Sequence, residues 1–164
     1  MRWNRVTGTA VISAGTVLLA ALLTGAASGS GTSHTEHFRF MSTSVPDDKF
    51  NVIATGVFTD GGTATPLGSS NKLTFPDGTI NVASKSKNKP VTNANTTTCY
   101  ETLSDQGTYT ITGGTGKYRG ITGSGTYTLE IREIGPKVNG KCDTQTSKRI
   151  ASQAILKAYG PVRF

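Results

Sequence analysis

Two near-copies of one short pattern, Gly107-Thr-Tyr-Thr-Ile-Thr112 and Gly125-Thr-Tyr-Thr-Leu-Glu-Ile-Arg132, lie in the second half of this chain and decide its fold. In each copy, aromatic or aliphatic residues alternate with threonine or charged residues, which is the period-2 pattern of a strand with one buried face. β-Branched residues suit a pleated surface, and glycine permits the tight turns between strands. The two copies therefore predict two strands that flank a glycine-rich connection, as in a β-hairpin.

Similar segments of strand length, separated by turn residues, occur on both sides of these copies. We expect Asp60-Gly61-Gly62 to break one strand and residues 84–96 to form a polar loop. The chain has no capped helical pattern, and strands at this spacing are typical of an all-β sandwich or barrel. About eight strands are expected, and they contain Phe38–Phe40, 50–58, Leu73–Phe75, Ile80–Val82, 97–103, 107–112, 125–132 and Ile150–Tyr159.

The central stretch also carries a family resemblance. Residues 112–127, Thr-Gly-Gly-Thr-Gly-Lys-Tyr-Arg-Gly-Ile-Thr-Gly-Ser-Gly-Thr-Tyr, resemble the glycine-rich stretch of allene oxide cyclase-like and dirigent-like barrels. Residues 54–58 and 158–162 resemble an early and a closing strand of the same families. The resemblance covers about residues 36–164 and implies a single closed antiparallel β-barrel of about eight strands with an apolar cavity, in a secreted branch of actinobacterial type.

The same resemblance suggests a type of activity, but it does not assign an activity to this chain. Plant members of these families cyclise a fatty-acid epoxide or steer radical coupling. Their catalytic residues lie outside the matched stretch, so they have no assigned counterparts in this chain. An isomerase or cyclase function is therefore an alternative and not the main expectation.

The N-terminus has the pattern of a secretory signal peptide. Arg2 and Arg5 precede an uncharged run over residues 10–23, and small residues follow it. This run is shorter than the roughly 20 apolar residues of a membrane-spanning helix, which is the rival interpretation. We expect residues 1–27 to be removed, residues 28–35 to form a flexible lead-in, and residues 36–164 to form a secreted barrel with no stable membrane anchor.

Charge and cysteine content limit the partners. The chain has a net charge of +7, which favours either simple solubility or contact with anionic surfaces such as cell-wall polymers. The basic cluster at residues 85–89 lacks interleaved aromatic residues, so no nucleic-acid partner is expected. Cys99 and Cys142 are the only cysteines, and in an oxidising compartment such a pair favours one disulfide over a free nucleophilic thiol or a metal site.

No cofactor or metal is expected from the motifs. Lys117 is followed by tyrosine where a phosphate-binding loop needs serine or threonine, and no helix follows it. The only histidines, His34 and His37, would point to opposite faces of one strand. Glu101 is a weak candidate for an acid or base in the cavity, because it shares a strand face with Cys99, whereas Glu130 lies on a threonine face and is expected in solvent.

The sequence thus favours a secreted barrel that holds a small apolar molecule in its cavity. Phe38, Phe40, Tyr109 and Tyr127 are the aromatic residues expected to line or fill that cavity. The alternatives are an enzyme of cyclase or isomerase type and a structural or cell-surface barrel with a filled core. Scarce acid–base residues argue against an enzyme. The identity of the ligand, the oligomeric state and the physiological role stay open.

Overall fold

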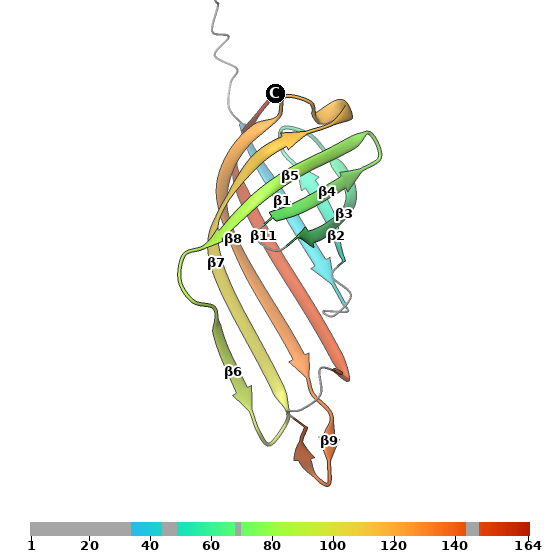
Figure 1. Cartoon of the computed structure of the whole chain (residues 1–164), viewed down its shortest axis with the longest axis vertical. Coiled ribbons are helices and arrows are strands. Elements are labelled where there is room, and N and C mark those ends of the chain that lie inside the picture. Colours follow the sequence, from blue (N-terminus) through green and yellow to red (C-terminus); the bar gives the residue numbers. More distant parts are fainter. Residues whose placement is uncertain (1–33, 44–48, 68–69, 144–147) are drawn as a thin grey trace, which may run out of the picture. The chain divides into compact units, whose positions relative to one another are not determined.

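The protein is described by a computed structural model that covers residues 34–43, 49–67, 70–143 and 148–164 (Figure 1). The expected signal peptide and residues 28–33 lie outside this part. Its elements are β1 (His34–Ser42), β2 (Phe50–Thr55), β3 (Asp60–Leu67), β4 (Ser70–Phe75), β5 (Gly78–Ser86), β6 (Val91–Asn95), β7 (Tyr100–Gly114), the 3₁₀ turn η2 (Gly116–Tyr118), β8 (Thr122–Ile134), β9 (Lys137–Val138), β10 (Lys141–Cys142) and β11 (Ala151–Arg163).

Eight of these strands form a closed antiparallel β-barrel, which confirms the expected fold. The strands follow the order β1, β2, β3, β4, β5, β7, β8 and β11, and β11 pairs with β1. Pairing of β5 with β7 closes the ring. Closure leaves no free sheet edge in the barrel and surrounds one set of alternating side chains completely.

Three strands continue beyond the barrel (Figure 1). The upper part of β7, residues 107–114, pairs with β5, whereas residues 100–104 pair with β6. We call the open sheet formed by β6, residues 100–104, 130–134 and 151–155 the extension. Its strands keep the antiparallel register of the barrel on β7, β8 and β11.

Three local predictions were wrong. Residues 60–62 begin strand β3 instead of forming a break, because the chain has already turned at Gly56, whose φ of +138° favours glycine. β6 lies within the predicted polar loop, where it pairs with the edge of β7 that β5 leaves free. The separately predicted strands at 97–103 and 107–112 belong to one continuous strand, β7, in which Gly107 permits close packing, because a Cβ there would lie 2.7 Å from the Tyr127 ring.

The predicted disulfide is confirmed. Cys99 and Cys142 are bonded, with their Cα atoms 5.4 Å apart. Cys99 lies in the turn between β6 and β7, and Cys142 ends the small β9–β10 hairpin. The bond therefore joins the far end of the extension to the connection between β8 and β11. Among the described residues, no helix is long and apolar enough to cross a membrane.

The glycine-rich connection after β7 closes one end of the barrel. Thr115 N–H and Lys117 N–H donate to the carbonyls of Thr79 and Asp77, at 2.8 and 2.9 Å. A Cβ at Gly116 would come within 2.0 Å of the Asp77 carbonyl, so this turn requires glycine. These amides bond to the protein's own carbonyls and are not directed at a bound phosphate.

Aromatic side chains fill the same end of the barrel. The Tyr118 ring centroid lies 5.1 Å from that of Phe58 and 5.2 Å from that of Phe75. All three side chains are buried. We call Phe58, Phe75 and Tyr118 the aromatic plug, and it leaves the opposite end of the barrel as the side from which the interior is reached.

Candidate functional site

The barrel encloses a cavity of about 410 Å³ between the aromatic plug and the extension. This volume lies within the range of about 300–1,000 Å³ that is typical of small-molecule sites. Most of its wall is apolar because the inward positions of the surrounding strands are aliphatic or aromatic. The wall consists of Phe38, Phe40, Phe50, Ala64, Asn71, Leu73, Val82, Ser84, Ser86, Asp105, Tyr109, Tyr127, Leu129, Leu156 and Ala158.

The structure brings the four aromatic residues singled out from the sequence to this wall. Phe38 and Phe40 are alternate residues of β1, and both contribute to the wall. Tyr109 on β7 meets Phe38 edge to face, with ring centroids 6.2 Å apart. Tyr127 comes from the neighbouring strand β8. Aromatic residues therefore line the cavity from two sides, and they leave its volume open instead of filling it.

A polar cluster lies where the cavity meets the extension. Asp105 Oδ2 accepts hydrogen bonds from the Tyr127 hydroxyl and the Ser86 hydroxyl, both at 2.8 Å. The two hydroxyls are themselves 3.2 Å apart. Asn71 donates to Ser84 on the same wall at 3.4 Å. Asp105 thus places a carboxylate, held by two hydroxyl donors, beside the apolar part of the cavity.

A second carboxyl group is buried deeper in the barrel. Glu36 on β1 is completely inaccessible to solvent, and its Oε2 accepts a hydrogen bond from the Phe58 N–H at 3.1 Å. Burial raises the pKa of Glu36, although backbone donors at Phe58, Val57 and His37 oppose this shift. The group is therefore biased toward its protonated form compared with a glutamate in water.

Tyr109 is the wall residue that interacts with this glutamate. Burial raises the pKa of its phenol to about 12, and the nearby charge of Glu36 adds to the effect. Tyr109 O–H and Glu36 Oε1 are both buried, and neither has a hydrogen-bond partner among the described residues. Tyr109 on the cavity wall and Glu36 beyond it therefore each have a polar atom whose bonding capacity the protein does not use.

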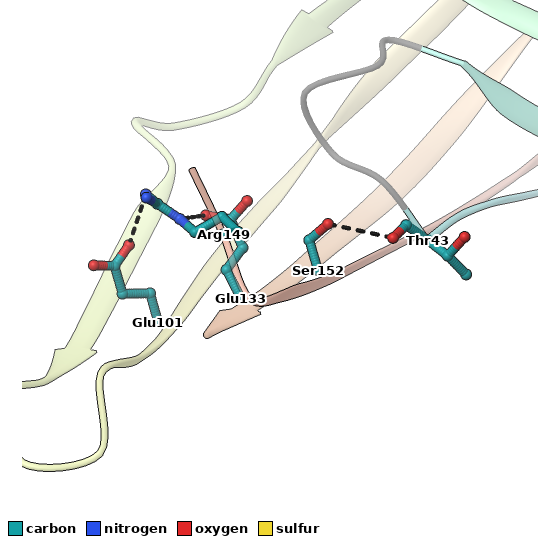
Figure 2. Close-up of polar contacts among 5 residues, drawn as sticks. All are labelled: Thr43, Glu101, Glu133, Arg149 and Ser152. Atoms are coloured by element: carbon teal, nitrogen blue, oxygen red, sulfur yellow. Dashed lines mark hydrogen bonds and ion pairs between the residues drawn. The ribbon is translucent and has the colours of Figure 1, made fainter. Parts of the chain in front are cut away.

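Glu101, the weak catalytic candidate, does not line the cavity. It lies in the extension, and Figure 2 shows its carboxylate next to Arg149, which also contacts Glu133. The Arg149–Glu101 and Arg149–Glu133 distances are 3.4 and 2.9 Å. The side chain does take the inward phase of β7, as its alternation predicted, but β7 has left the closed barrel at this point. Its contacts are those of a structural ion pair.

The expectation that Glu101 is the strand carboxylate best placed to line the cavity was therefore wrong. Sequence reasoning missed Glu36 and Asp105, although a signal for both was present. Glu36 precedes Phe38 by two residues, and Asp105 precedes Tyr109 by four, so each shares the inward phase of a predicted cavity residue. Glu130 lies on the outer face as expected, and it is bonded to Arg132.

The ionisable groups at and near the cavity are acidic. In the described part of the chain, its wall contains no lysine, arginine or histidine, and Asp105 is its only ionisable carboxyl group. Glu36 lies beyond the inner end. The described residues also contain no group of three or more His, Cys, Asp or Glu side chains able to hold a metal ion. The site thus offers apolar surface, hydroxyl groups and carboxyl groups.

Comparisons with protein family models, with characterised proteins and with solved structures found no match to this chain.

Proposed function

We propose that this chain is an exported protein whose barrel binds a small, largely apolar molecule. The cavity of about 410 Å³ with its aromatic and aliphatic wall is the observation that carries this proposal. Burying apolar ligand surface against such a wall is favourable by about 25 cal/mol per Å². A barrel with a merely structural role would gain stability by filling this volume with side chains, so the cavity favours a ligand over a structural function.

Export is the second part of the proposal. It is supported by the basic, apolar and small-residue pattern of residues 1–27 and by the bond between Cys99 and Cys142, because disulfides persist in oxidising compartments. Kinship with allene oxide cyclase-like or dirigent-like barrels is the third part. It is supported by the pattern at residues 112–127 and by the eight-stranded closed barrel.

An isomerase or cyclase activity is the second candidate function, and one observation favours it. Glu36 is a buried carboxyl group near the inner end of the cavity, where a desolvated acid or base acts with a pKa different from that in water. Under this alternative, Glu36 replaces Glu101 as the candidate group. The binding function needs no such group and is the one that the apolar wall favours.

Native mass spectrometry of the purified protein tests ligand binding without assuming a ligand. We expect a mass adduct of a small apolar compound that is lost from Ala158→Leu, because Ala158 lines the cavity and leucine would occupy part of it. Ala151→Leu is the matched control, since Ala151 is exposed on the same strand. An adduct of equal intensity in both variants would place the ligand elsewhere and contradict the proposal.

A further inference from the structure

Two buried polar atoms have no hydrogen-bond partner among the described residues: the Tyr109 hydroxyl, which is on the cavity wall, and Glu36 Oε1, which is not part of that wall. Leaving such a group unsatisfied typically costs about 1–3 kcal/mol. The opposite carboxylate oxygen of Glu36 is fixed by the Phe58 N–H, so the orientation of this side chain is constrained by the loop that follows β2. An unsatisfied hydroxyl on the cavity wall indicates a position where a ligand atom can bind.

The two groups belong to one neighbourhood although they come from different strands. Phe38 follows Glu36 by two residues on the inward face of β1, and the edge-to-face contact of its ring with Tyr109 joins β1 to β7. Tyr109 also experiences the charge of Glu36, and it is 4% exposed. A ligand that fills the cavity therefore has the Tyr109 hydroxyl at its inner end and the Asp105 cluster at its outer end.

The character of the surrounding groups restricts the charge of that ligand. The Tyr109 hydroxyl can donate or accept one hydrogen bond. No cation lines the cavity within the described residues, and the Asp105 carboxylate would repel an anion. Burying an anionic head group without a partner would carry a large desolvation penalty.

On the basis of the binding function proposed above, we propose that the cavity takes an amphiphile head first, with an uncharged hydroxyl or carbonyl oxygen bound by the Tyr109 hydroxyl. The apolar tail then lies along the aromatic wall toward the Asp105 cluster. A carboxylate of the same chain length is rejected. Burial, which raises the pKa of the Tyr109 phenol to about 12, supports this assignment because it keeps the hydroxyl in its hydrogen-donating form.

A displacement assay with a neutral fluorescent dye, 1-aminoanthracene, separates this inference from the binding function. Added dye is needed because Trp3, in the expected signal peptide, is the only tryptophan. We expect the dye to bind the wild-type protein and Ala151→Leu but not Ala158→Leu. Failure to bind the wild type would overturn the binding function, and the inference with it.

The inference itself is tested by competition between 1-decanol, 2-decanone and decanoate. We expect both neutral compounds to displace the dye at concentrations at least tenfold lower than decanoate does. We also expect Tyr109→Phe to weaken the binding of 1-decanol by roughly tenfold, which corresponds to the loss of about one good hydrogen bond. Tyr100→Phe is the matched control, because Tyr100 lies on the same strand in the extension and is 39% exposed.

Two results would overturn the inference while leaving cavity binding intact. One is equal displacement by decanoate and 1-decanol. The other is unchanged 1-decanol affinity in Tyr109→Phe, which would mean that only water satisfies this hydroxyl. Thermal unfolding of each variant verifies that the folded protein is compared, and removal of an unpaired hydroxyl is not expected to prevent folding.

Discussion

The barrel and the extension share three long strands, β7, β8 and β11, yet inward-facing carboxyl groups have opposite surroundings in the two regions. In the barrel, Glu36 is enclosed on every side and its pKa is raised. In the extension, Glu101 takes the same inward phase but remains partly exposed and paired with Arg149. Alternation places both side chains inward. Whether the sheet is closed around a side chain determines whether that side chain is buried from solvent.

The features that bear on function and those that bear on stability also lie in different regions of the molecule. The closed part contains the cavity and the unsatisfied polar groups, which are costly unless a ligand uses them. The open part contains the disulfide and the ion pairs of Arg149, which join β7, β8 and the segment before β11. We therefore expect changes in the extension to alter stability with little effect on ligand binding.

The largest expected effect comes from removing the disulfide. The bond closes a loop with a sequence separation of 43, and the chain-entropy model gives a stabilisation of about 4 kcal/mol, which is often smaller in practice. We expect the double variant Cys99→Ser, Cys142→Ser to lose about 2–4 kcal/mol of unfolding free energy in urea. Binding of 1-aminoanthracene should persist below the new transition.

Hydrogen exchange supplies the regional readout for the same variant. Protection should fall more for amides of β6 and of residues 100–104 than for those of β1 and β2, because the bond ends in the extension. An equal loss of protection in all four segments would show that the barrel and the extension unfold as one unit, and the proposed division between them would be wrong.

Neutralising each of the two inward carboxyl groups is expected to have an intermediate effect on stability, and the effects of the two substitutions have opposite signs. Glu36→Gln removes an ionisable group from a buried position while keeping an oxygen for the Phe58 N–H, so we expect it to raise the unfolding free energy at neutral pH by about 1 kcal/mol. Glu101→Gln weakens its ion pair with Arg149, and we expect it to lower stability by less than about 1 kcal/mol.

The effect at Glu36 has a defined pH dependence. Because the folded-state pKa is raised above the ordinary value of 4.5, the folded protein binds this proton more tightly than the unfolded chain does. The stability contributed by the wild-type side chain is fully present below that ordinary value and is lost as pH rises through the folded-state pKa. The advantage of Glu36→Gln should grow across this window, measured by urea unfolding at several pH values. A constant difference would contradict the raised pKa.

These two glutamates also define what the sequence can predict. The alternation of Phe38 with Phe40, and of Tyr109 with its threonine neighbours, is a local property, so the inward faces of β1 and β7 could be predicted from it. The point at which β5 gives way to β6 along β7 depends on pairing between segments that are distant in sequence. Glu101 was therefore assigned to the correct face of the strand, but it lies in the extension and not in the closed barrel.

The same limit explains the missed strands. β6 consists of exposed, mostly polar residues, and its strand structure comes from hydrogen bonding to β7 rather than from its own composition. β3 begins at Asp60 with two glycines, which in isolation indicate a turn. Both elements depend on the sheet to which they pair. The disulfide was easier to predict, because a chain with two cysteines allows a single pairing within it.

The smallest expected effect on stability comes from substituting two arginines in or next to the extension. Arg149 contacts both Glu101 and Glu133, and its side chain is 22% exposed (Figure 2), whereas Arg132 contacts Glu130 at a site where its side chain is 50% exposed. Exposed ion pairs contribute about 0–1 kcal/mol, with more where several charges form a network. We expect Arg149→Met to cost about 1 kcal/mol in urea unfolding and Arg132→Met to cost less.

Salt should distinguish the two sites further. Screening by added salt weakens exposed pairs more than partly buried ones, so the cost of Arg132→Met should vanish in 1 M salt while that of Arg149→Met largely persists. Dye binding should be unchanged in both variants, since neither arginine lines the cavity. If Arg149→Met instead weakened dye binding as strongly as it weakened folding, the ion pairs of the extension would control the shape of the cavity, and the two regions would be coupled rather than independent.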